Sequence, residues 1–199
     1  MKNDAIVFLS PNAYQSLLVS AVEVYPRETN GLLTGYKLPD GNYRVEHAHP
    51  FQTSERGFEW TCEGNNSAVK RVQTLLAALN GQPSRPHAIG GYHSHPQRRA
   101  LAKVSPSEKD LAWVREKLSR IPEENSWLEL IMRVDVPFLE RPSEKGPTHY
   151  RRLKKLRTTV RHAPTKAYGF LTGAFLIHPE EGYDELRVEL AQKPQHESI

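Results

Sequence analysis

Residues 90–96 read Gly-Gly-Tyr-His-Ser-His-Pro, and residues 107–110 read Ser-Glu-Lys-Asp. The first stretch ends a short, mostly apolar run that is typical of a strand. Pro96 is expected to end this strand, because it has no backbone N–H for the ladder. Side chains alternate along a strand, so His93 and His95 point to the same face. Two imidazoles on one face can bind one metal ion, and the stretch therefore predicts a metal site at a strand end.

The second stretch is predicted to begin a helix and to supply a third ligand. Ser107 is a good N-cap, and acidic residues follow it in the first turn. Asp110 comes three residues after Ser107, so the two share one helical face. Catalytic zinc commonly has three protein ligands and a water in the fourth position. His93, His95 and Asp110 are therefore predicted to hold one catalytic Zn²⁺ ion.

Residues 28–35, Glu-Thr-Asn-Gly-Leu-Leu-Thr-Gly, place a glutamate beside a glycine-bounded strand. Zinc lowers the pKa of bound water to about 7. A nearby carboxylate can take that proton and pass it to a leaving amine, and Glu28 is predicted to be this general base. Ser107 is predicted to donate a hydrogen bond to the oxyanion of a tetrahedral intermediate, besides capping its helix.

Glu28, the His-Ser-His-Pro stretch at 93–96 and the Pro-Ser-Glu-Lys-Asp stretch at 106–110 together resemble the JAMM motif of the JAB/MPN metalloprotease family. The resemblance covers roughly residues 1–135. It implies an α/β (α+β) fold of the MPN/JAB type, with a cytidine-deaminase-like mixed central sheet flanked by helices. It also implies a zinc-dependent isopeptidase, because characterised relatives cleave ubiquitin or ubiquitin-like modifiers from lysine side chains or trim modifier precursors.

The resemblance further implies partners and rival roles. The expected partner is a ubiquitin-like protein or its conjugates, whose C-terminal tail would enter extended and pair with a sheet edge. Bacteria and archaea carry such enzymes beside ubiquitin-like conjugation systems, so E1/E2-like conjugation enzymes are further candidate partners. Two alternatives stay open. One is a non-catalytic MPN scaffold that binds other proteins, and the other is a RadC-like DNA-associated role, which the basic composition would suit.

The spacing of the motif departs from the family's pattern. Fourteen residues, 96–109, separate His95 from Asp110, which is longer than the family's usual spacing. Insertions between fixed elements are tolerated in surface loops, so the ligand assignment is kept. The added loop, residues 97–104, is basic, and we expect it to contact substrate. By resemblance, the proline-containing loop at 135–147 is expected to do the same.

A second His-x-His-Pro string occurs at residues 47–50. No serine with an aspartate three residues later follows it nearby, so the string is interpreted as part of an ordinary strand. Cys62 is the only cysteine, which excludes an intrachain disulfide, and it is interpreted as a small hydrophobe. The lack of cysteine pairs fits a reducing compartment, and we expect a cytoplasmic location. We find no segment with the apolar length of a signal peptide or membrane span.

The 199 residues fit one domain, expected over residues 1–190, with a flexible tail at 191–199. The formal charge is +4, and much of the excess lies in residues 151–161. This basic run is interpreted as a solvated face, with an acidic protein partner or a nucleic-acid backbone as alternatives. No aromatic residues interleave with it, which weakens the nucleic-acid alternative.

Hydrophobic periodicity and turn residues predict the order of elements. Helices are expected at 11–24, 66–79 and 107–119, the first with Ser10 as its cap. Besides the histidine-bearing strand, strands are expected at 5–10, 31–37, 43–49, 127–134, 150–160, 168–177 and 186–190. Residues 51–64 are expected to be irregular, and the run 151–161 fits a helix as well as a strand.

Overall fold

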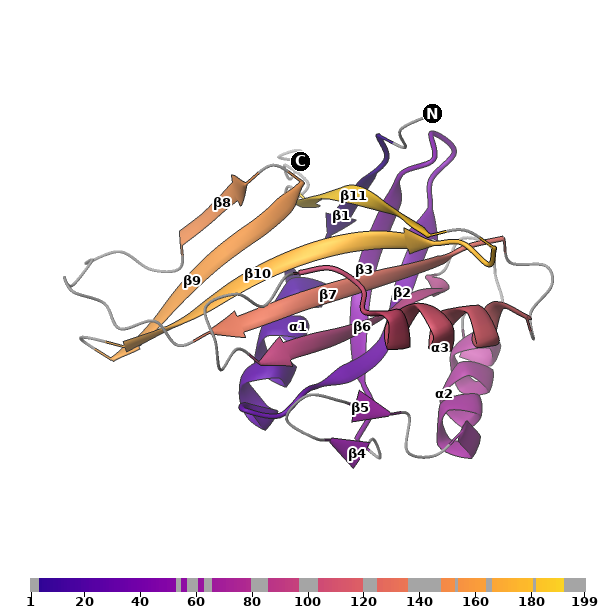
Figure 1. Cartoon of the computed structure of the whole chain (residues 1–199), viewed down its shortest axis with the longest axis horizontal. Coiled ribbons are helices and arrows are strands. Elements are labelled where there is room, and N and C mark those ends of the chain that lie inside the picture. Colours follow the sequence, from indigo (N-terminus) through magenta and orange to yellow (C-terminus); the bar gives the residue numbers. More distant parts are fainter. Residues whose placement is uncertain are drawn as a thin grey trace, which may run out of the picture.

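The computed structural model describes residues 4–52, 55–56, 61–62, 66–79, 86–96, 104–119, 125–135, 148–152, 154–163, 166–180 and 182–191. This part of the chain is a mixed α/β structure, with a nine-stranded sheet, three helices and a two-stranded ribbon (Figure 1). The helices are α1 (Pro11–Val24), α2 (Asn66–Leu79) and α3 (Glu108–Ser119). The strands are β1 (Ile6–Leu9), β2 (Asn30–Lys37), β3 (Tyr43–Pro50), β4 (Glu55–Arg56), β5 (Thr61–Cys62), β6 (His87–Pro96), β7 (Trp127–Asp135), β8 (Thr148–Arg152), β9 (Lys155–Ala163), β10 (Lys166–Ile177) and β11 (Tyr183–Leu190).

The main sheet combines parallel and antiparallel pairs in the order β11-β1-β3-β2-β6-β7-β10-β9-β8. β1 runs parallel to β3 and β11, and β6 runs parallel to β7, whereas β2 pairs antiparallel with both β3 and β6. β10 also pairs antiparallel with β11, so the first strand in this order is hydrogen-bonded to the seventh as well as to β1. α3 is the crossover between the parallel strands β6 and β7. The histidine-bearing strand β6 therefore has β2 on one side and β7 on the other.

The helices cover opposite faces of the sheet, as Figure 1 shows for α1 and α3. α1 begins as predicted, with Oγ of Ser10 accepting the Ala13 N–H at 3.1 Å and Pro11 in the first turn. The buried side chains of α1 join the core on one face. On the other face, Leu111 and Val114 of α3 join a second core. The predicted metal site lies on the α3 side.

Gly173 on β10 has no side chain, and this leaves room for the start of α3 to lie close to the sheet. A Cβ atom on Gly173 would lie 3.0 Å from Cγ1 of Val104. Val104 is buried and lies shortly before the first turn of the helix. This close approach sets the first turn of α3 against the sheet, on the face that carries the histidines.

Most predicted elements are confirmed, including all three helices and the strands at both ends of α1. Two predictions are wrong. Residues 51–64 contain β4 and β5, which pair with each other and are too short to show periodicity. Residues 150–160 form two antiparallel strands, β8 and β9, rather than one. The helical alternative for residues 151–161 is also wrong, because β9 pairs with β10 over most of its length.

Several predictions fall on residues that the structure does not describe. They are the loop residues 97–103 and 136–147 and the tail residues 192–199. The extent of the single domain, residues 1–190, stays a prediction. In the described part of the chain, no helix has the length and apolar character needed to cross a membrane.

Candidate metal centre

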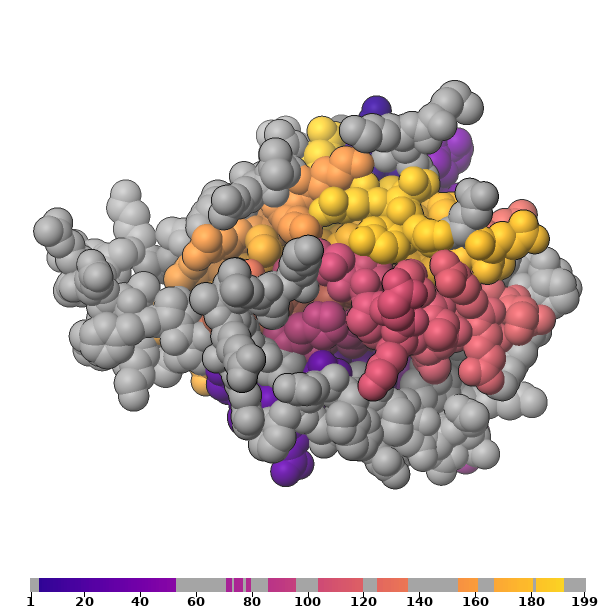
Figure 2. All heavy atoms as spheres, viewed as in Figure 1, coloured from indigo at the N-terminus to yellow at the C-terminus, as the bar shows by residue number. Residues whose placement is uncertain are grey.

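His93 and His95 lie on the same face near the end of β6, as their spacing predicted. Their Nε2 atoms are 3.1 Å apart and their ring centroids 4.8 Å apart. His93 is 7% exposed, whereas His95 is more open to solvent. Figure 2 shows the α3 side of the molecule, where atoms of β6 reach the surface beside the helix. The pair thus combines a buried ring with one that solvent reaches.

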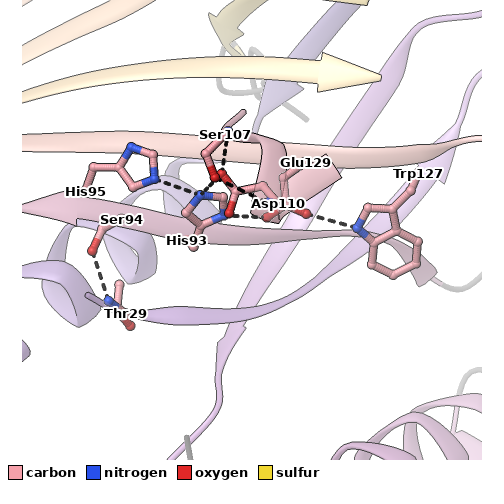
Figure 3. Close-up of polar contacts among 8 residues, drawn as sticks. All are labelled: Thr29, His93, Ser94, His95, Ser107, Asp110, Trp127 and Glu129. Carbon is pink, nitrogen blue, oxygen red and sulfur yellow. Dashed lines mark hydrogen bonds and ion pairs between the residues drawn. The ribbon is translucent and has the colours of Figure 1, made fainter. Parts of the chain in front are cut away.

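The third predicted ligand comes from the first turn of α3 (Figure 3). Oδ2 of Asp110 lies 3.6 Å from Nε2 of His93. The potential ligand atoms of Asp110, His93 and His95 all lie within 4.8 Å of one another. The same Oδ2 accepts the Ser107 N–H at 2.7 Å, and the Asp110 N–H donates to Oγ of Ser107 at 3.3 Å. This reciprocal capping fixes the carboxylate at the helix start.

The donor set fits a zinc ion. Zinc prefers imidazole nitrogen, thiolate and carboxylate oxygen in a tetrahedron with metal–ligand distances of about 2.0–2.2 Å for nitrogen and oxygen. Such a tetrahedron separates its ligand atoms by about 3.3 Å. Two of the three separations, 3.1 Å between His93 and His95 and 3.6 Å between His93 and Asp110, bracket that value, and all three atoms lie within 4.8 Å of one another. Three protein ligands would leave one position open, as in catalytic zinc sites.

Two carboxylates determine the protonation of His93. Burial by itself lowers the pKa of His93, but the hydrogen bonds and negative charges of Asp110 and Glu129 outweigh burial and raise the pKa to about 10. Burial likewise raises the pKa of Asp110. The hydrogen bond and charge of His93, together with hydrogen bonds from Ser107, outweigh it and hold this pKa well below its usual range. Without a metal the centre therefore keeps a proton at neutral pH, and metal binding requires its loss.

Glu28 lies shortly before β2 and is 6% exposed. β2 and β6 pair antiparallel with Asn30 opposite His93. The Ser94 N–H donates to the Thr29 carbonyl at 2.8 Å, and the Thr29 N–H donates to Oγ of Ser94 at 3.0 Å. Glu28 directly precedes Thr29, whose backbone is thus hydrogen-bonded to Ser94 of β6. These contacts place the backbone next to the predicted base near the end of β6.

Ser107 is exposed at the start of α3 and acts as its cap. Its Oγ accepts the Asp110 N–H, and a side-chain hydrogen bond from Ser107 is among the causes that hold the pKa of Asp110 below its usual range. A hydroxyl that accepts one hydrogen bond keeps its proton for another partner. Capping and donation to an oxyanion are therefore compatible for this side chain.

Sequence reasoning missed Glu129, which contacts His93 from β7. Oε1 of Glu129 lies 2.8 Å from Nδ1 of His93, and the residue is 3% exposed. The signal is present in the sequence, because Glu129 interrupts the otherwise apolar run Trp-Leu-Glu-Leu-Ile-Met at 127–132. A buried acid needs a partner. The partner can be named only from the parallel register that sets Gly91 of β6 beside Glu129.

The second His-x-His-Pro string lies on β3 and takes no part in the centre. Nε2 of His49 lies 3.1 Å from Oγ1 of Thr34. Burial lowers the pKa of His49, and the charge of the nearby His47 lowers it further. Over the described ranges, the group of potential metal ligands consists of His93, His95 and Asp110. The interpretation of residues 47–50 as an ordinary strand is confirmed. The Cys62 side chain lies outside the described part.

Comparison with known proteins gives a family and a fold. A family model for prokaryotic homologs of the JAB domain matches residues 10–145, a span that includes Glu28, His93, His95, Ser107 and Asp110. No curated protein matches the chain in sequence. The structure is similar to the solution structure of a protein from Desulfitobacterium hafniense, with a TM-score of 0.55 and 20% identity over 96% of this chain and 97% of that one. At this identity the likeness concerns the fold alone.

Proposed function

The chain belongs to the family of prokaryotic homologs of the JAB domain, and from this membership we propose that it is a zinc-dependent isopeptidase or peptidase acting at the C-terminus of ubiquitin or ubiquitin-like modifiers. The observation that carries the proposal is the convergence of His93, His95 and Asp110 at the end of one strand. Three ligands with an open fourth position support hydrolysis rather than a purely structural metal site.

In the proposed centre, His93, His95 and Asp110 hold one Zn²⁺ ion. When bound, zinc polarises a carbonyl group and lowers the pKa of its water to about 7. Glu28 accepts a proton from the attacking water and delivers it to the leaving amine. Ser107 donates its O–H to the oxyanion that forms at the attacked carbonyl. The buried position of Glu28 and the position of Ser107 beside Asp110 at the start of α3 support these two roles.

The proposed substrate is the extended C-terminal tail of a ubiquitin-like protein. The bond cleaved is the amide between the modifier's last carbonyl and either a lysine side chain or the next residue of a precursor. An extended tail binds by pairing with a sheet edge.

The proposed partners are the modifier, its conjugates and E1/E2-like conjugation enzymes of the same pathway, in the cytoplasm. The same resemblance motivates the proposal of a cytidine-deaminase-like sheet.

The test is hydrolysis of modifier fusions. The purified chain is incubated with reporter fusions of ubiquitin and of prokaryotic ubiquitin-like proteins, first as isolated, then after chelation, and then after zinc is returned. We expect cleavage directly after the last residue of the modifier, loss of cleavage on chelation, and recovery with zinc. A chain that binds one zinc ion but cleaves neither fusions nor lysine-linked conjugates would contradict the proposed activity and favour a non-catalytic scaffold.

A further inference from the structure

We propose that Glu129 is a positioning residue of the metal centre, which holds the His93 ring so that Nε2 is the atom presented to the metal. The inference rests on the proposed function, in which His93 is a ligand. Glu129 acts only through His93. Trp127 anchors its carboxylate, and Gly91 leaves the space in which the carboxylate lies.

The carboxylate of Glu129 is fixed through both of its oxygens (Figure 3). Oε1 lies 2.8 Å from Nδ1 of His93, and Nε1 of Trp127 donates to Oε2 at 3.0 Å. A carboxylate only accepts hydrogen bonds, so Nδ1 of His93 carries the proton in this contact. Nδ1 is thereby occupied. The remaining ring nitrogen, Nε2, is the atom that faces His95 and Asp110.

The surroundings of Glu129 explain why its direction is fixed. The residue is 3% exposed, and an ionised carboxylate is strongly disfavoured in such a place without hydrogen-bond partners. Swinging away from His93 would leave Oε1 without its partner in the core. The register of β6 and β7 sets Gly91 beside Glu129, where a side chain would occupy the same space. The ring of His93 is thus held against a group that itself has little freedom to move.

Lys117, a cation on α3, contacts Trp127, the residue that donates to the Glu129 carboxylate. Nζ of Lys117 lies 3.7 Å from the centroid of the Trp127 ring, and a cation over an indole face is attracted to the ring. Lys117 lies two turns after Asp110 on the same helix. α3 therefore reaches His93 twice, directly through Asp110 and indirectly through Lys117, Trp127 and Glu129. Both contacts fix the ring relative to this helix.

A buried ion pair without a role in metal binding is the rival explanation. It would stabilise the fold, and its removal would leave the affinity for zinc unchanged. The chain offers a control for the contact itself, because Nε2 of His178 lies 3.2 Å from Oδ2 of Asp184 at a more exposed histidine–carboxylate pair outside the centre. Substitution of Asp184 removes the same kind of contact without touching the proposed ligands.

The first experiment measures zinc affinity by competition with a chromophoric chelator, in the full chain and in Glu129→Gln, Glu129→Ala, Trp127→Phe and Asp184→Asn. We expect zinc affinity to fall roughly 10–100-fold in both Glu129 variants, which is the usual effect of removing such a partner of a ligating histidine. Trp127→Phe keeps the carboxylate but removes its anchor, so a smaller loss is expected. Asp184→Asn should bind zinc as the natural chain does. Unchanged affinity in folded Glu129→Gln would overturn the proposal.

The second experiment observes the His93 ring by nitrogen-15 NMR. In the metal-free and zinc-loaded natural chain, we expect a protonated Nδ1 with a downfield, exchange-protected N–H signal. That signal should shift in Glu129→Gln, disappear in Glu129→Ala and persist in Asp184→Asn. An unchanged signal in Glu129→Ala would refute the role of Glu129. If the natural chain bound no zinc, the proposed function would fail, whereas this measurement would still decide whether Glu129 orients the ring.

Discussion

A Cβ atom on Gly91 would lie 2.9 Å from Oε2 of Glu129, so the buried carboxylate fills the space that a side chain at Gly91 would need. The indole Nε1 of Trp127, which donates to the same oxygen, would be 3.3 Å away. The absence of a side chain at Gly91 on β6 therefore makes room for Glu129, which contacts His93. A glycine two residues before a predicted ligand thus contributes to the geometry of the predicted centre.

Gly91→Ala should lower both the zinc affinity and the free energy of unfolding. The added methyl group displaces the buried carboxylate of Glu129, which loses hydrogen-bond geometry with His93 and Trp127 at a cost in stability. The measurement is a zinc competition titration together with the unfolding temperature. Gly41→Ala is the control, because Gly41 has a φ of 83°, and we expect about 1–2 kcal/mol of lost stability with unchanged zinc affinity. Wild-type zinc affinity in Gly91→Ala would contradict the prediction.

Ser107→Ala should reduce the rate of hydrolysis far more than its structural effect explains. Loss of a helix cap costs about 1 kcal/mol of stability, whereas loss of an oxyanion donor lowers kcat by roughly 10²–10³-fold. Ser10→Ala removes the corresponding cap of α1, away from the centre. The two variants are compared by kcat for a modifier fusion and by urea unfolding. Equal, small losses of activity in both would assign Ser107 to capping alone.

Glu28→Ala should separate zinc binding from hydrolysis. Glu28 is outside the predicted ligand set, so the variant should retain one zinc ion per chain. Loss of general acid–base catalysis should lower kcat by roughly 10²–10⁴-fold. The prediction is checked by measuring zinc content and kcat on the same preparation. Full activity in the variant would show that the proposed base is wrong, and loss of zinc would show that Glu28 is needed to form the centre.

The metal-free chain should become less stable between about pH 6.5 and pH 10 through His93. Below about pH 6.5 the imidazole is protonated in both folded and unfolded chains, so its contribution is complete. Above that pH the unfolded chain loses the proton while the folded chain keeps it up to a pKa of about 10, so the contribution declines and is lost as pH rises through that value.

This pH dependence is measured by urea unfolding in the presence of a chelator. His93→Asn should flatten the slope over the same range, because it removes the titrating group. At the acid end, the pKa of Asp110 is held below its usual range, so its contribution is present near pH 5 and is lost as pH falls towards its folded pKa. A natural chain whose stability rose from pH 7 to pH 9 relative to His93→Asn would contradict the expected sign.

The parts of the centre that follow from local rules could be predicted from the sequence. Strand alternation places His93 and His95 on one face, and the cap signature places Asp110 in a first helical turn beside Ser107. Both rules act over a few residues. They hold here although fourteen residues separate His95 from Asp110.

The contacts that depend on register could not be predicted in this way. Glu129 meets His93 because β6 and β7 pair in parallel with Gly91 beside Glu129, and no local pattern specifies that alignment. The division of residues 148–163 into β8 and β9 likewise depends on pairing, of β8 with β9 and of β9 with β10. Strand pairing between distant segments decides these features, and it overrides what each segment would prefer alone.

The central claim, that His93, His95 and Asp110 hold one zinc ion, is tested most directly by the zinc content of the purified chain, of His95→Ala and of His47→Ala. His47 belongs to the other His-x-His-Pro string, on β3, and is the matched control. We predict one zinc ion per chain for the natural protein and for His47→Ala, and none for His95→Ala under the same conditions. A natural chain that took up no zinc after reconstitution, or a His95→Ala variant that kept a full equivalent, would contradict the account.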